Sequence, residues 1–398
     1  MRLLAVALAL LIASPAHASS DRASFESWLE TKAWPEAKAA GVSRATFKRE
    51  TRGLTPDYTI SNLRGRHAKR KQQAEFRPPA RYFNQRSLSS LAKRGQALSR
   101  RHDKVLSRIE KKWGVPRGII LAIWARETGY GTANLPKDGL RQLATLGYAG
   151  VRPDYFRSEM IAALRMLENG VPRARLRSSW AGALGQPQFL PSKYLDYAVD
   201  LDGGGADIWS SVPDTLASIA NYLAEHGWQR GRDWGFEADV PDNVACHLGG
   251  PDQGRPIADW AAMGVERVKG RRFPAHEKQG KGYLLFPAGR YGPAFVTTPN
   301  FYVLKKYNES DAYALFVGHL ADRIGGGKPF VGEWQALTGF DRFQVQRMQE
   351  RLVSMDYDVG GADGLVGYKT RGAIGLWQEK RGERPTCFPT KGIVGALK

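Results

Sequence analysis

The sequence predicts a mainly α-helical protein with a small strand-containing insertion and a small helical domain near its C-terminal end. Three observations predict this fold class. Apolar residues recur at helical spacing from Phe25 onward and again from Tyr313. Between residues 233 and 298 Gly and Pro are frequent, and the apolar runs are short and extended, as at 282–286 and 294–298. A Gly-rich break follows, and the segment after it has an apolar pattern of its own.

Residues 1–18 have the pattern of a cleaved secretory signal peptide. Arg2 supplies the positive charge, Leu3–Ala13 is apolar, and Ala16–Ala18 matches the small-residue cleavage site. A short membrane anchor is the alternative, but the apolar run is shorter than the ~20 residues that span a bilayer. No later segment has that length, so no transmembrane segment is expected. No cysteine stands near the cleavage site, so we expect an exported protein that is not a lipoprotein.

Charge and cysteine content narrow the classes of partner. The formal net charge is +20, from 59 Lys+Arg against 39 Asp+Glu. For an exported protein this balance favours an acidic envelope polymer over nucleic acid, although solvated faces also explain much of it. An oxidising compartment permits one disulfide between Cys246 and Cys387, but their spacing does not decide whether they meet. Neither cysteine has a metal-like spacing to another ligand, which argues against a zinc site.

Two segments outside the main helical region have distinctive compositions. Residues 64–81 are polar and basic, and they suit either docking to an anionic wall or a solvated helix face. Gly325–Pro329 predicts a linker over residues 326–335. Two short helices are predicted after it, at 343–352 and 370–380.

A helix from Pro116 to Glu127 carries the first candidate catalytic group. Proline suits the first helical position, and two glycines soon after Glu127 end the helix. A carboxyl among apolar neighbours loses hydration, which favours the neutral, proton-donating form that a general acid needs. The alternative is an exposed or Arg-paired glutamate. The apolar residues on the face of Glu127 are Ile120, Ile123 and Trp124.

Two further segments combine small, amide and aromatic residues. Ser178–Pro191 holds glycines that allow close approach of a ligand or another backbone. Its Gln186 and Gln188 offer uncharged donors and acceptors that suit sugar hydroxyls and N-acetyl groups. Asn300–Asn308, with Tyr313 beyond it, is a second polar and aromatic cluster. A tight structural turn and a core stripe are the respective alternatives.

Six short segments occur in a fixed order along the chain: Trp113–Pro116, Glu127–Gly131, Gly182–Pro191, Ala220–Leu223, Asn300–Tyr302 and Tyr307–Asn308. Together they resemble the lytic murein transglycosylase B family. The resemblance extends over residues 19–325, which it identifies as the catalytic domain, with the insertion at about 233–298. It implies a lysozyme-like helical core, a periplasmic location and peptidoglycan glycan strands as the substrate.

The same resemblance implies roles for individual residues. Glu127 corresponds to the catalytic acid and base. An upstream family tyrosine corresponds to Tyr82, where the flanking residues match loosely. Some family members carry a calcium loop, but at 200–207 this chain has Gly204 where such a loop needs an oxygen ligand, so we expect no metal, with calcium at this loop as the alternative. The residues that correspond to substrate contacts are Ser179, Gln188, Tyr222, Tyr307, Asn308 and Tyr313.

The last segment has a resemblance of its own. Asp363–Thr370 has the spacing D-G-x-x-G-x-x-T, and apolar residues at helical spacing flank it on both sides. This pattern resembles the three-helix peptidoglycan-binding domain, and we assign it to residues 336–398. The tail from Arg384 departs from that pattern.

These observations predict an exported peptidoglycan lytic transglycosylase acting in cell-wall turnover and remodelling. It would cleave the β-1,4 bond between N-acetylmuramic acid and N-acetylglucosamine and leave 1,6-anhydromuramyl ends. No phosphate-cradling loop is present, so neither a nucleotide nor a redox cofactor is expected. Other cell-wall enzymes are further candidate partners. A hydrolytic muramidase and a non-catalytic wall-binding scaffold are the alternatives.

Overall fold

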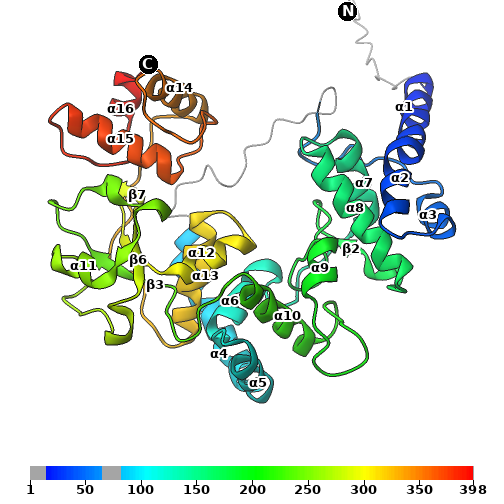
Figure 1. Cartoon of the computed structure of the whole chain (residues 1–398), viewed down its shortest axis with the longest axis horizontal. Coiled ribbons are helices and arrows are strands. Elements are labelled where there is room, and N and C mark those ends of the chain that lie inside the picture. Colours follow the sequence, from blue (N-terminus) through cyan, green and yellow to red (C-terminus); the bar gives the residue numbers. More distant parts are fainter. Residues whose placement is uncertain (1–14, 65–81, 398) are drawn as a thin grey trace, which may run out of the picture. The chain divides into compact units, whose positions relative to one another are not determined.

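The computed structural model describes residues 15–64 and 82–397, which form many helices and two antiparallel sheets, one of two strands and one of five (Figure 1). The mainly helical fold class predicted from the sequence is confirmed. Residues 1–14 of the predicted signal peptide and residues 65–81 of the basic stretch lie outside the described residues. Among the helices that the structure describes, none combines the length and apolar character needed to cross a bilayer.

The chain forms two compact units. The first comprises residues 15–64, 133–198 and 207–211, and the second comprises 82–132, 199–206 and 212–397. In the first unit, α7 and α8 pack against each other, and α2 and α3 pack on α8. Its elements are α1 (Pro15–Trp28), the π-helix η1 (Leu29–Ala33), α2 (Trp34–Ala39), α3 (Arg44–Thr51), β1 (Lys137–Asp138), α7 (Gly139–Ala149), α8 (Pro153–Glu168), the 3-10 helix η5 (Arg173–Arg175), β2 (Arg177–Ser178) and α9 (Pro191–Tyr197).

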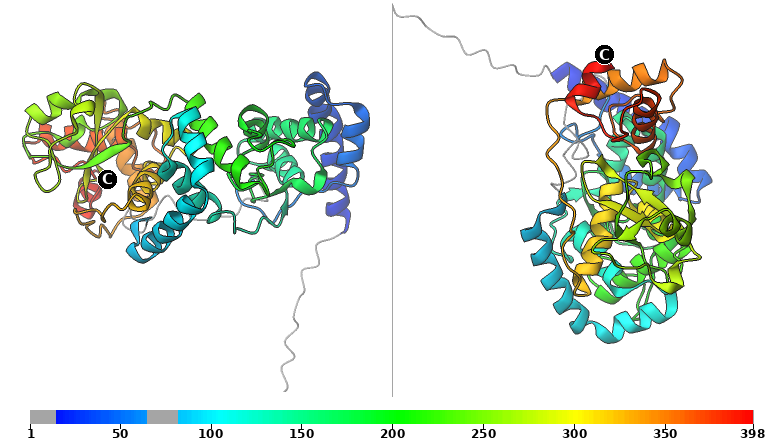
Figure 2. Two further views of the ribbon diagram at one scale, coloured as in Figure 1. Left: turned by 90° about the horizontal axis from the view of Figure 1, so that it is seen from below. Right: turned by 90° about the vertical axis from the view of Figure 1, so that its left-hand side faces the viewer.

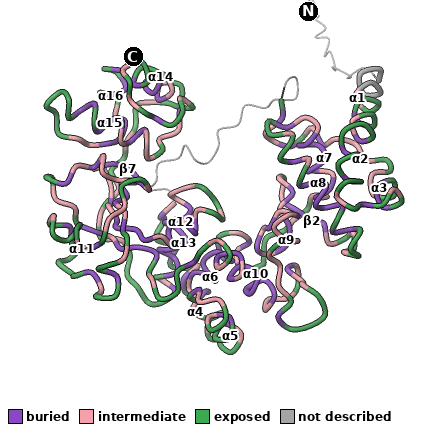
Figure 3. The backbone as a smooth tube through the Cα atoms, in the orientation of Figure 1, coloured by how far each residue is buried: buried purple, intermediate pink, exposed green. Residues whose placement is uncertain are grey.

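Helix α6 lies at the centre of the helical part of the second unit. It packs on α13, α4 and α10, and every residue of Ile119–Ala125 is buried (Figure 3). The apolar face predicted from the sequence was therefore too narrow, because neighbouring helices enclose α6 on most sides. The helix begins at Arg117 with Pro116 as its N-cap, so it starts one residue later than predicted. The helices are α4 (Gln85–Arg101), α5 (Asp103–Trp113), α6 (Arg117–Thr128), α10 (Val212–Glu225), α12 (Pro299–Tyr307) and α13 (Asp311–Ile324).

The insertion of the second unit contains an antiparallel sheet with the strand order β4-β6-β8-β3-β5. The two predicted extended runs form its central strands β6 and β8, with Leu284 opposite Val296. Both of these residues are buried in the core of the insertion, together with Trp260 of α11. The elements are β3 (Gly235–Asp239), η6 (Cys246–Leu248), η7 (Pro251–Gln253), β4 (Arg255–Pro256), α11 (Ile257–Ala262), β5 (Glu266–Arg267), η8 (Ala275–Glu277), β6 (Lys281–Leu285), β7 (Pro287–Arg290) and β8 (Ala294–Thr297).

The C-terminal segment folds around a core of its own, built from α14 (Arg342–Val353), α15 (Tyr368–Lys380) and α16 (Lys391–Ala396). The buried Gln349 organises the turn between α14 and α15. Its amide nitrogen donates to Leu365 O at 2.8 Å and to Thr370 Oγ1 at 2.9 Å, and its amide oxygen accepts from Gly364 N at 2.7 Å. The D-G-x-x-G-x-x-T spacing therefore belongs to a loop that is held by hydrogen bonds to the buried Gln349 amide.

A disulfide joins this C-terminal segment to the sheet. Cys246 and Cys387, whose pairing the sequence left open, are bonded at 2.03 Å. Beside the disulfide, Arg290 N donates to Thr386 O at 2.9 Å. Gly289 has a φ of +57°, and a Cβ there would collide with the carbonyl oxygen of Thr386, so only glycine fits. The helices of the segment accordingly lie next to the sheet in both views of Figure 2.

The predicted linker, residues 326–335, is packed along the second unit. Phe330 stacks on His319 with ring centroids 3.7 Å apart, and Trp334 stacks on Phe83 at 5.1 Å. The Glu237 carboxylate accepts hydrogen bonds from two backbone N–H groups of the segment. Two aromatic side chains in a Gly-rich segment explain this packing, because burying them outweighs the entropy that a free linker would keep.

His319 predicts a pH dependence of stability. It is 2% exposed, and burial, with a smaller effect of the Arg323 charge, lowers its pKa from 6.5 to about 3. The unfolded chain binds a proton at His319 below pH ~6.5 and the folded chain does not, so stability falls as the pH drops from 6.5 towards 3. When the pH is lowered from 7 to 4.5, the free energy of unfolding of His319→Phe, measured by urea titration, should fall by about 2 kcal/mol less than that of wild type. Parallel losses in the two proteins would refute this assignment.

Candidate active site

Glu127 lies in the last turn of α6 and is half-buried. The Tyr313 hydroxyl donates to Glu127 Oε1 at 2.5 Å. Tyr313 is 4% exposed and stands in the first turn of α13, whose N-cap Ser310 accepts a hydrogen bond from Tyr313 N. A rigid helix end therefore holds the phenol against the carboxylate.

A row of tyrosines extends from this pair. Tyr307 stacks on Tyr313 with ring centroids 6.4 Å apart and an interplanar angle of 10°, and Tyr222 meets Tyr307 edge-on at 5.0 Å. The Tyr222 hydroxyl donates to Lys306 O at 2.5 Å. Burial, and then the negative charge of Glu127, raise the pKa of Tyr307 and Tyr313 well above the usual value. Both phenols therefore stay protonated and able to donate at neutral pH.

Two other predicted residues contact sequence neighbours of this site, Ser310 and Arg126. Asn308 is the exposed C-cap of α12, and its side-chain oxygen accepts from Ser310 N at 3.1 Å. The ring of Tyr82 lies 5.5 Å from the guanidinium of Arg126, the residue before Glu127. The loosely matched Tyr82 is thus placed near the end of α6 that carries the candidate acid.

Ser179 and Gln188 belong to the first unit, in the loop after β2. Ser179 Oγ accepts from Ala183 N at 3.2 Å, and Gln188 Nε2 donates to Gly185 O at 3.0 Å. Gly182 has a φ of +83°, and a Cβ there would collide with Leu143 of α7. Internal hydrogen bonds and close packing therefore preform this loop, and both side chains remain partly exposed. Their contact with substrate remains a prediction.

Some amides in the predicted clusters are structural. Asn300 is fully buried, accepts from Gln229 N at 2.7 Å and donates to the carbonyls of Gln229 and Arg232 at 2.9 Å. Gln186 Nε2 donates to Trp209 O at 3.0 Å.

Sequence reasoning also missed His226, whose ring stacks under Tyr222 at a centroid distance of 4.0 Å. His226 stands one residue after the end of α10 and four residues from Tyr222, and this spacing was the available signal.

Three acidic side chains gather at the segment that was compared with a calcium loop, and two of them belong to it. Ligand atoms of Asp200, Asp202 and Asp214 lie within 4.8 Å of one another. Both Asp200 carboxylate oxygens already accept backbone N–H groups, at 2.7 and 2.9 Å, and Asp214 Oδ1 accepts Leu201 N. Calcium takes about six to eight oxygen ligands, which three carboxylates alone supply only if each binds through both of its oxygens.

Residues 24–322 match the profile of the transglycosylase SLT domain, which is well over half of the chain. The chain belongs to this family of lytic transglycosylases. The membrane-bound lytic murein transglycosylase B of Escherichia coli (strain K12) is 32% identical over 242 residues. That alignment covers 58% of this chain and 63% of the Escherichia coli protein, less than two thirds of its length.

Solved structures within the family resemble the chain over a longer span. SltB3 from Pseudomonas aeruginosa, in complex with NAG-anhNAM-pentapeptide, is 37% identical and has a TM-score of 0.85. The match covers 94% of this chain and 99% of SltB3. The soluble lytic transglycosylase SltB1 of the same organism is 28% identical with a TM-score of 0.61, and the match covers 76% of this chain and 98% of SltB1. The lysozyme-like family fold inferred from the sequence motifs is thereby confirmed.

Proposed function

We propose that this protein cleaves peptidoglycan strands between N-acetylmuramic acid and N-acetylglucosamine and leaves 1,6-anhydromuramyl ends. The observation that carries the proposal is the contact between Tyr313 and Glu127, which fixes a carboxyl group within a row of neutral phenols. SltB3, solved with NAG-NAM-pentapeptide and NAG-anhNAM-pentapeptide, supports the same substrate class.

In this reaction Glu127 carries out two successive proton transfers. Its carboxyl first gives a proton to the glycosidic oxygen, and the bond between that oxygen and C1 of the muramyl residue breaks. The carboxylate then takes the proton of the muramyl C6 hydroxyl while the C6 oxygen bonds to C1. The proton returns to Glu127, no water is consumed, and one glycan chain becomes two.

The neighbours of Glu127 favour this reaction over hydrolysis. Ordinary glycosidases place two carboxylates about 5–9.5 Å apart, and the second serves as base or nucleophile. The side chains in the row beside Glu127 are the phenols of Tyr313, Tyr307 and Tyr222. They orient and stabilise a substrate but do not activate water as a carboxylate does, so the substrate's own C6 hydroxyl is the better nucleophile.

The location and the wall contact belong to the same proposal. We infer export to the periplasm through the signal peptide at residues 1–18, and the buried Cys246–Cys387 disulfide supports an oxidising compartment. We infer that residues 336–398 bind peptidoglycan. Their independent core, and exposed apolar side chains at Phe343, Val353 and Leu376, support a domain with a binding surface.

Purified sacculi test the activity, since the full-length mature chain should release soluble muropeptides from them. An inactive preparation that is folded by circular dichroism would contradict the proposal.

Hydrogen–deuterium exchange of the Glu127→Gln chain tests the wall contact, because this variant should hold glycan fragments without cutting them. Added fragments should slow exchange within residues 336–397. Unchanged exchange there would contradict the binding role.

Tyr313→Phe tests the contact that carries the proposal. The change removes one hydroxyl and keeps the ring that stacks on Tyr307. A hydrogen bond to a charged group contributes about 1.5–3 kcal/mol, so we expect kcat/KM on soluble glycan fragments to fall roughly 10- to 100-fold. Tyr357→Phe, the same change in the core of the C-terminal segment, is the control and should leave the rate unchanged. Equal rates for the two variants would contradict the role of Tyr313.

A further inference from the structure

Arg371 connects the C-terminal segment to the helices of the active site. It lies on α15, is 7% exposed, and its Nη2 donates to Asp311 Oδ2 at 2.8 Å. Asp311 also accepts from Lys305 Nζ at 2.6 Å. One carboxylate therefore joins two cations, Lys305 from the last turn of α12 and Arg371 from the C-terminal segment.

Asp311 directly follows the turn between α12 and α13, the helices that carry Tyr307 and Tyr313. It is the first residue of α13, two positions before Tyr313, and its partner Lys305 lies two positions before Tyr307. The ion pair of Lys305 and Asp311 closes the turn that contains Asn308. Tyr313, whose hydroxyl donates to Glu127, follows this turn in the first turn of α13.

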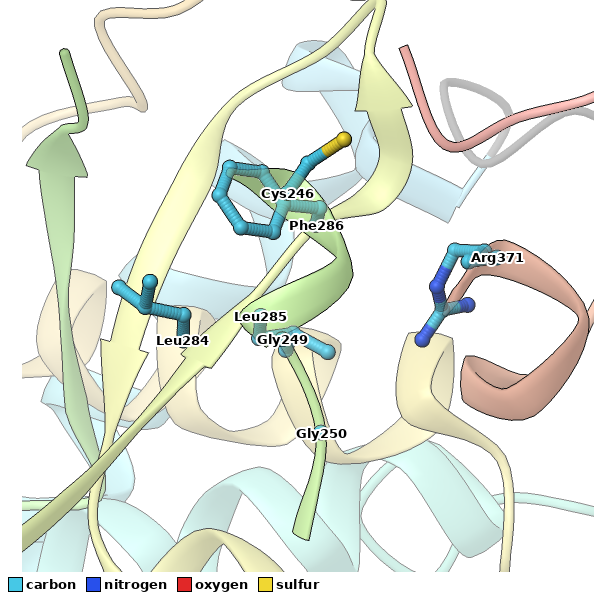
Figure 4. Close-up of a pocket in the computed structure, with 7 residues that line it drawn as sticks. All are labelled: Cys246, Gly249, Gly250, Leu284, Leu285, Phe286 and Arg371. Carbon is cyan, nitrogen blue, oxygen red and sulfur yellow. The ribbon is translucent and has the colours of Figure 1, made fainter. Parts of the chain in front are cut away.

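Arg371 belongs to a segment that two other contacts hold against the insertion. The Cys246–Cys387 disulfide ties the C-terminal segment to the insertion, and the Tyr368 hydroxyl donates to Asp252 at 2.8 Å. Figure 4 shows the guanidinium extending from α15 towards the loop with Gly249 and Gly250, beside a cavity of about 10 Å³. A cavity of that size is too small for a ligand. The arginine is thus enclosed and has little freedom to take another position.

We propose that the C-terminal segment has a second role, in which Arg371 acts through Asp311 to position Tyr313 against Glu127. This inference rests on the proposed function, because it concerns the rate of the same reaction. Arg371 is a positioning residue that touches neither substrate nor Glu127. The domain that contacts the wall therefore also completes the support of the active site.

Three variants test this role in the full-length chain. In Arg371→Met the charge is lost and the length is nearly kept, so kcat should fall about tenfold with a smaller change in KM, since small displacements of catalytic groups are costly. Arg371→Lys should restore kcat to within about threefold of wild type, because Asp311 takes a single hydrogen bond from the arginine. Arg347→Met, the same change at an exposed position of α14, is the control and should leave kcat unchanged.

A double-mutant cycle separates positioning from general stabilisation. If Arg371 acts through Tyr313, Arg371→Met should lower kcat by less than about twofold in the Tyr313→Phe background, because the two effects share one route. A purely structural role would lower the melting temperature without changing kcat, or the two losses of kcat would multiply in the double variant. Either result would overturn the proposal. Asp311→Asn repeats the cycle from the other end of the ion pair if Arg371→Met does not fold. A wild-type chain that fails to cut glycan refutes the proposed function instead, so the two failures are distinguishable.

Discussion

Glu127→Gln is expected to abolish lysis of sacculi while the protein stays folded. Glutamine keeps the shape of the side chain, and its amide still accepts the Tyr313 hydrogen bond, but it neither gives nor takes the catalytic proton. General acid–base catalysis contributes about 10²–10⁴-fold, and here one group serves both steps, so the loss should be at least of that order. The release of soluble muropeptides measures it.

Glu350→Gln is the matched control for this experiment. Glu350 is exposed on α14, and the same change there should leave the activity at the wild-type level. Melting curves of both variants should overlay with wild type. A Glu127→Gln protein that retains more than about a tenth of the activity would show that another group supplies the proton.

Loss of the disulfide is expected to have the largest effect on stability. Cys246 and Cys387 are 141 residues apart in sequence, so the cross-link removes a large loop entropy from the unfolded chain. We expect Cys246→Ala with Cys387→Ala to lower the free energy of unfolding by about 2–5 kcal/mol, measured by urea titration. Alanine is chosen because both positions are buried, and a serine hydroxyl there would lack a partner.

Reducing agent provides the control for the disulfide. It should shift the urea midpoint of the wild-type chain towards that of the double variant and leave the double variant unchanged. If Arg371 positions the active site, the double variant should also lose part of its kcat, because the support of α15 is weakened. Identical midpoints for the variant and the oxidised wild type would contradict the stabilising role.

Local patterns predicted the elements that local physics determines. The helix ending at Glu127, the two central strands and the two longer C-terminal helices follow from apolar spacing, prolines and glycines, and all are present with small shifts at their ends. Motif resemblance placed Glu127, Tyr313, Tyr307 and Tyr222, which the structure brings together in one unit.

Long-range partners could not be predicted from the sequence. Nothing near Asp311 indicates that Arg371, sixty residues away, is its partner, and the cysteine spacing does not show that the disulfide forms. The Gly-rich segment after α13 was predicted to be a linker, because the pattern of its glycines does not show that Phe330 and Trp334 find stacking partners. These contacts depend on how the sheet, α13 and the C-terminal segment pack together.

Mass spectrometry of peptidoglycan digested in water enriched with heavy oxygen distinguishes attack by the C6 hydroxyl from attack by water. We expect muropeptides with 1,6-anhydromuramyl ends, lighter by one water than reducing-end products and free of heavy oxygen at C1. Reducing-end muramic acid that carries one heavy oxygen from the solvent would refute the proposed reaction, because it would show that water and not the C6 hydroxyl attacks C1.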